Sequence, residues 1–95
     1  MVVGVASIEL YLHGVHSLKA KRSVVRRIIH RTKNKFELSV AEVDALDRHQ
    51  SAVIGVCIVS NDARLANSIL DKVIDFVVEL HLAEVTHSKL EILHV

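Results

Sequence analysis

The sequence has few of the residues on which many kinds of site depend. Cys57 is the only cysteine, which excludes a disulfide framework and a cysteine-ligated metal cluster. The chain has three glycines and only three aromatic residues. It has no glycine-rich phosphate loop before a helix and no HExxH motif. No apolar run approaches the ~20 residues that a membrane-spanning helix needs. We therefore expect a cytoplasmic protein without a metal or a cofactor.

What is present is typical of one globular domain over residues 1–95. Hydrophobic residues make up 51% of the chain and charged residues 24%, a balance that favours a packed core over disorder. The first residues lack the basic segment of a signal peptide, and Glu9 interrupts the apolar stretch that follows. We expect this stretch to be a strand.

Positive charge is concentrated in one segment of the chain. Residues 17–35 contain eight lysines and arginines and no acidic residue, whereas the rest of the chain has four bases against eleven acids, a net charge of −7. The formal net charge of +1 conceals this separation. Such asymmetry bears on the partners of a protein and says little about its fold.

Hydrophobic periodicity predicts four strands and two helices. Residues 2–12 alternate with period two, as in a strand with one side facing the core, and shorter apolar segments predict strands over 38–44, 52–60 and 85–93, with a loop over 45–50. A basic amphipathic helix is predicted from Leu18 to about residue 35, with Ser17 as its N-cap. A second helix is predicted after Asp62. The expected apolar positions are Val2, Ala6, Ile8, Leu10 and Leu12 in the first strand, Val25, Ile29 and Phe36 with Ile28 and Thr32 beside them in the first helix, and Leu65, Ile69, Val73, Phe76 and Leu80 in the second.

The order β-α-β-β-α-β predicts an α+β, ferredoxin-like sandwich, in which a four-stranded antiparallel sheet carries two helices on one face. The first and third strands should lie at the centre, and the opposite face of the sheet is then uncovered. An apolar patch facing water is unusual for a monomer, so we expect a homodimer through this face, unless a loop or a chain end covers it. The expected interface residues are Val3, Val5, Val53, Cys57 and Val59.

Four segments of the chain, residues 1–5, 16–22, 39–43 and 59–64, resemble the small bacterial DUF503 family, also called YlxP-like. The resemblance covers nearly the whole chain and implies the ferredoxin-like fold. Genes of this family often lie among those for translation initiation and ribosome assembly, so the resemblance also implies a role near RNA. The chain differs from the family in having Ala20 where a glutamate would complete a capping box with Ser17, and His49 where relatives tend to have an aromatic residue.

The basic helix is the strongest candidate for a functional site. Its spacing arranges the bases in two ridges that match phosphates along a nucleic acid backbone. Docking on an acidic protein surface and a solvated helix exterior remain alternatives. Because only Tyr11 should face the open side of the sheet, we expect any RNA binding to depend on charge and shape and not on stacking. The expected nucleic-acid-binding residues are Lys19, Arg22, Arg26, Arg27, Arg31, Lys33 and Lys35.

Other polar groups give weaker signals. Glu42 and Asp44, expected on one face of a strand, could anchor Mg²⁺ together with Asp47, although a charged edge that discourages strand pairing is the more usual arrangement. Residues 60–62 favour helix capping over anion binding, and Cys57 is expected to act as a small buried hydrophobe. With no triad or paired carboxylates, we predict a protein that is not an enzyme. It would contact structured RNA or a ribosomal particle, or else be a homodimeric protein-interaction or small-ligand module that uses the open sheet.

Overall fold

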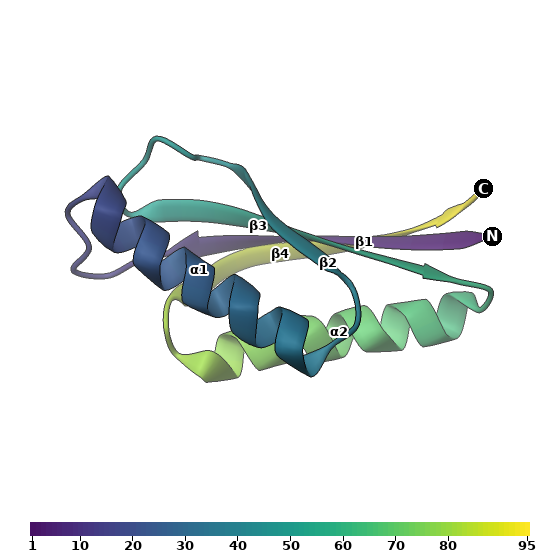
Figure 1. Ribbon diagram of the computed structural model, residues 1–95. Helices are drawn as coiled ribbons and strands as arrows, with labels where there is room; N and C mark the ends of the chain where they lie inside the picture. Colours follow the sequence, from purple (N-terminus) through teal and green to yellow (C-terminus); the bar gives the residue numbers. More distant parts are fainter.

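The fold is a single sheet with both helices packed on one side (Figure 1). A computed structural model describes residues 1–95. The sheet has the order β2-β3-β1-β4, and each pair of neighbours is antiparallel. The elements are β1 (Val2–Tyr11), α1 (Leu18–Lys35), β2 (Ser39–Asp44), β3 (Ser51–Ser60), α2 (Ala63–Leu80) and β4 (Glu84–His94). The predicted ferredoxin-like α+β fold is confirmed.

β1 lies at the centre of the sheet and is paired along its whole length on both sides. Val5, for example, lies opposite Cys57 of β3 and Glu91 of β4. The predicted alternation is confirmed, because Ile8 and Leu12 are fully buried beneath the helices while Glu9 is exposed on the other face. Irregularities in register occur between Glu9 and Leu10 and between Glu42 and Asp44.

The buried side of α2 differs from the predicted one. The buried residues of α2 are Ala66, Leu70, Val73 and Val77, whereas Leu65 is 52% exposed. The predicted buried side was therefore wrong by about one residue at the start of the helix. The reason is the close approach of α2 to β1. A Cβ atom at Gly4 would lie 2.8 Å from Leu70 Cδ1 and 3.5 Å from Ala66 Cβ, so the close packing of α2 on β1 depends on the small residues Gly4 and Ala66.

The ends of α2 are fixed by local chemistry. The carboxylate of Asp62 accepts hydrogen bonds from the backbone N–H groups of Arg64 and Leu65 at 3.0 and 3.2 Å, which confirms the predicted cap. The helix ends at His81, whose φ of 53° is left-handed. Neither helix is long and apolar enough to cross a membrane.

Candidate nucleic-acid interface

α1 begins where the sequence predicts, at a serine cap. The hydroxyl oxygen of Ser17 accepts a hydrogen bond from the backbone N–H of Ala20 at 3.1 Å. The first turn contains no acidic residue, while Lys33 and Lys35 lie in the last turn, where cations interact favourably with the helix dipole. The helix rises about 27 Å over its 18 residues. The bases are therefore carried by one long, continuous helix.

One base of α1 does not face solvent. Lys21 is 1% exposed and lies on the buried side of the helix with Val25, Ile28 and Thr32. Its ammonium lies 2.9 Å from Glu42 Oε2 and donates hydrogen bonds to the carbonyl oxygens of loop residues 45 and 46, at 2.5 and 3.4 Å. The contact with Glu42 lacks the angles of a hydrogen bond and is an ion pair. Lys21 is not among the seven bases expected to bind nucleic acid, and its charge is paired within the chain.

The same ion pair changes the interpretation of Glu42. Its carboxylate points to Lys21, on the helix side of the sheet, and its side chain is 14% exposed. Asp44, across the register irregularity of β2, is exposed and accepts a hydrogen bond from the backbone N–H of Ala45 at 2.7 Å. The expectation that Glu42 and Asp44 share a face was therefore wrong, and Glu42 has a structural partner within the chain.

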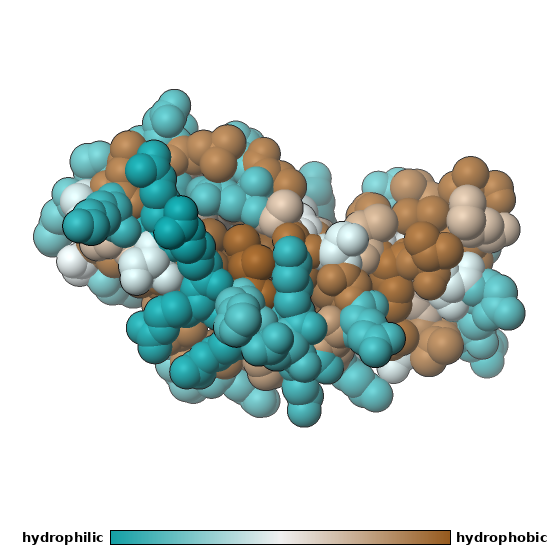
Figure 2. Space-filling model, viewed as in Figure 1, coloured by the Kyte–Doolittle hydropathy of each residue, from teal (hydrophilic) through white to brown (hydrophobic).

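The seven bases predicted to bind nucleic acid are all exposed. Besides their charge, they share the lack of an ion pair, since none lies within 4.0 Å of a carboxylate oxygen. The two ion pairs of the molecule are Lys21 with Glu42 and His13 with Glu84. Hydrophilic side chains accordingly follow the line of α1 across the surface in Figure 2. These residues are Lys19, Arg22, Arg26, Arg27, Arg31, Lys33 and Lys35.

The bases form two ridges along α1, as predicted from their spacing. Residues three or four positions apart lie on one face of a helix, about 5–6 Å apart. A shallow hollow on the helix surface is lined by Arg26, Arg27, Ile29, His30 and Lys33. Two arginines and a lysine thus border this hollow, and both residue types bind phosphate oxygens. The first ridge consists of Lys19, Arg22, Arg26 and Lys33, and the second ridge consists of Arg27, Arg31 and Lys35.

α2 provides a contrast on the same side of the sheet. Its exposed charges are of both signs, with acids at Asp71, Asp75 and Glu79 and bases at Arg64 and Lys72. This mixture is typical of a solvated helix. Of the two helices, only α1 carries bases without any acidic residue.

The five residues predicted to form an interface lie together on the sheet face that the helices leave uncovered. Val3 lies opposite Val59, and Val5 lies opposite Cys57. Val59 is 65% exposed, so neither a loop nor a chain end covers it. Val53, the fifth residue, lies opposite Glu9 at the other end of the same face.

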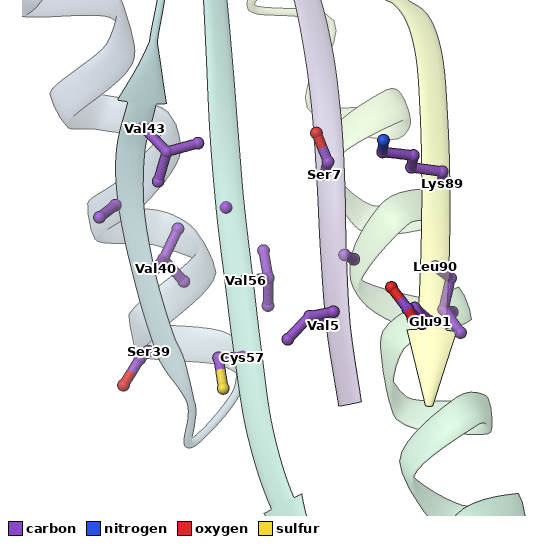
Figure 3. A pocket seen from close by; sticks show the side chains of 13 residues that line it. Val5, Ser7, Ser39, Val40, Val43, Val56, Cys57, Lys89, Leu90 and Glu91 are labelled. Atoms are coloured by element: carbon purple, nitrogen blue, oxygen red, sulfur yellow. The ribbon is translucent and has the colours of Figure 1, made fainter. Parts of the chain in front are cut away.

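This face also carries a groove that the sequence did not reveal. One row of cross-strand neighbours spans all four strands and consists of Ala41, Gly55, Ser7 and Lys89. The groove above this row has a volume of about 640 Å³. In Figure 3, Lys89 and Glu91 both extend from β4 toward β1. The available signal was Gly55, since a glycine inside a strand often marks a close approach.

Comparison with known proteins gives a family and no activity. A mutant of SnoaB, a cofactor-independent oxygenase from Streptomyces nogalater, superposes with a TM-score of 0.48 at 14% identity, over 99% of this chain and 92% of that one. The uncharacterized protein YlxP of Bacillus subtilis (strain 168) is 33% identical over 76 residues, which is 80% of this chain and 83% of YlxP. The family model described as "Protein of unknown function (DUF503)" matches residues 3–90. The resemblance seen in the sequence is thus confirmed, and the chain belongs to the DUF503 family.

Proposed function

We propose that this protein is a non-catalytic accessory protein that contacts structured RNA, such as that of a ribosomal particle, through the basic ridges of α1. The observation that carries the proposal is that seven bases are exposed along one helix and that none is paired with a carboxylate of the chain. Phosphates neutralised by such groups release counterions, which favours binding at low salt.

The mode of binding follows from the scarcity of aromatic side chains at the surface. Phe36 and Phe76 pack against each other edge to face, with ring centroids 5.6 Å apart, and both lie against the core. Recognition of single-stranded RNA by stacking needs aromatic residues on an open sheet, and Tyr11 is the one aromatic residue on that face. Contact through α1 is therefore directed at the phosphate backbone and the shape of the RNA.

The proposal predicts that charge reversal on α1 abolishes binding. The probe is an RNA hairpin of about 20 base pairs, and affinity is measured by fluorescence anisotropy at about 0.1 M salt. We expect Arg26→Glu with Arg27→Glu to weaken binding a hundredfold or more, because the lost contacts become repulsions. For the protein without substitutions, the logarithm of the association constant should fall with the logarithm of salt concentration with a slope of about −3, as expected for about four phosphates.

The matched control is Arg64→Glu with Lys72→Glu, which changes the net charge equally but lies on α2. We expect this variant to retain affinity within about threefold. An equal loss in both variants would show that only net charge matters, and unchanged binding after substitution of Arg26 and Arg27 would reject α1 as the contact surface.

A further inference from the structure

The uncovered face of the sheet is large enough to hold a partner of its own size. With strands of up to 11 residues, a rise of about 3.4 Å per residue and about 4.8 Å between strands, the face covers about 600 Å². Two such faces together would bury about 1,200 Å², which reaches the lower end of stable protein interfaces. The face carries no helix (Figure 1), and Val59 on it is 65% exposed.

We propose that this face binds a second copy of the chain, with the two sheets packed face to face about a two-fold axis. The axis lies between the sheets and runs across the strands at the level of Ala6, Val56 and Leu90. Rotation about it places each strand over the same strand of the partner, running in the opposite direction. Two rows of residues on either side of the axis then meet.

The two rows are complementary in shape. On one side of the axis lies the row of small residues Ala41, Gly55 and Ser7, which forms the floor of the groove. On the other side lies the row of Ser39, Cys57 and Val5. The rotation sets Val5 over the serine of the partner, so that a larger side chain faces a smaller one as two facing sheets interdigitate. Cys57 comes over Gly55 of the partner. The side chain of Val43 already covers that glycine, because Val43 Cγ1 lies 2.9 Å from the place of a Cβ at Gly55, so Cys57 packs against Val43 there.

The rows are also complementary in charge. The first row ends on β4 in Lys89 and the second in Glu91, both exposed and directed over the face. The same rotation brings Lys89 of each copy to Glu91 of the other, which gives two equivalent ion pairs. One further step from the axis, Val53 meets Val59 on β3, whereas Val3 meets the exposed Glu9 on β1, so the apolar contact continues along β3 alone. This self-complementarity is the reason to assign the face to a second copy.

The proposed dimer leaves α1 exposed, because both helices lie on the opposite side of the sheet (Figure 1). Dimerisation and RNA contact therefore depend on different side chains and can fail separately. Substitution of Val5 tests the first, and substitution of Arg26 and Arg27 tests the second.

The test is the oligomeric state of the full chain, measured by sedimentation equilibrium from about 1 to 100 μM. We expect a dimer at 10 μM. Val5→Glu buries an unpaired charge and should raise the dissociation constant of the dimer at least a hundredfold, with the fold checked by circular dichroism. Val78→Glu, at an exposed position of α2, is the control and should leave the dimer unchanged.

An exchange of charges tests the position of the axis. Lys89→Glu or Glu91→Lys alone places like charges together and should weaken the dimer about tenfold. Both substitutions together restore opposite charges, so the dissociation constant should return to within about threefold of its value without substitutions. Failure of the double variant to recover would overturn the axis. A monomer at 100 μM, with or without a small molecule retained in the groove by native mass spectrometry, would overturn the dimer.

Discussion

Lys21 is the residue whose environment says most about how α1 is held. A buried ammonium is costly unless its charge and its protons find partners, and here Glu42 and two loop carbonyl groups provide them. One of these carbonyls belongs to Ala45, whose φ of 58° is in the left-handed region that non-glycine residues seldom occupy. The lysine therefore ties the first half of α1 to β2 and to a strained loop.

This arrangement predicts strong energetic coupling between Lys21 and Glu42. In a double-mutant cycle with Lys21→Met and Glu42→Gln, each single change leaves the other group buried without its partner, so we expect a coupling energy of about 1–3 kcal/mol. The free energy of unfolding is measured by urea denaturation. The control is Lys19→Met, at an exposed position of the same helix, which should change stability by less than about 0.5 kcal/mol. A coupling energy near zero would contradict the buried ion pair.

At the scale of the element, α1 lacks a feature that would stabilise its first turn. Ser17 is the N-cap and Ala20 occupies the third helical position, where a glutamate or glutamine side chain could reach back to the backbone N–H of the cap. The first turn contains no acidic residue to interact with the helix dipole. With alanine there, the positive surface of the helix is uninterrupted from Lys19 to Lys35.

We predict that Ala20→Glu and Ala20→Gln separate stability from RNA binding. Both complete the capping box and should raise the free energy of unfolding by about 0.5 kcal/mol, measured by urea denaturation. Only the glutamate adds a negative charge next to the first ridge, so it alone should weaken binding to the RNA hairpin, by about threefold. Equal affinities of the two variants would contradict a contact through this part of α1.

The elements themselves were predictable from the sequence because their patterns are local. Alternation fixed the buried side of β1 from Ile8 to Leu12, and cap residues fixed the starts of both helices. The buried side of α2 was not predictable, because Leu65 and Ala66 are both apolar and only the approach to Gly4 distinguishes them. Contacts that join distant segments, such as Lys21 with Glu42, leave no local pattern.

At the scale of the whole molecule, the basic surface of α1 could be predicted from the sequence, whereas the groove on the open sheet face could not. The seven bases of α1 that were expected to bind nucleic acid follow a helical spacing, and the structure shows that all seven are exposed. The groove on the sheet depends on the cross-strand register that aligns Ala41, Gly55 and Ser7, and three separate strands contribute these residues. Only the apolar residues of that face, such as Val5, Cys57 and Val59, could be anticipated, from the order of the elements.

The molecule thus separates two surfaces on opposite sides of one sheet. α1 presents positive charge outward on one side, and the apolar face carrying Val5 and Gly55 lies on the other. In the proposed dimer the two apolar faces meet and the two α1 helices lie on the outer sides. Each copy would then keep its own basic surface free for RNA.

The most direct test of the central claim is to locate the RNA contact on the protein in its natural setting. After ultraviolet crosslinking of a native cell extract, the protein is isolated and its RNA-linked peptides are identified by mass spectrometry. We predict that nucleotides are attached within residues 18–35, and that the crosslinks disappear when Arg26 and Arg27 are both replaced by glutamate. Crosslinks confined to α2 or to the open sheet, or a protein recovered without RNA, would contradict the proposed function.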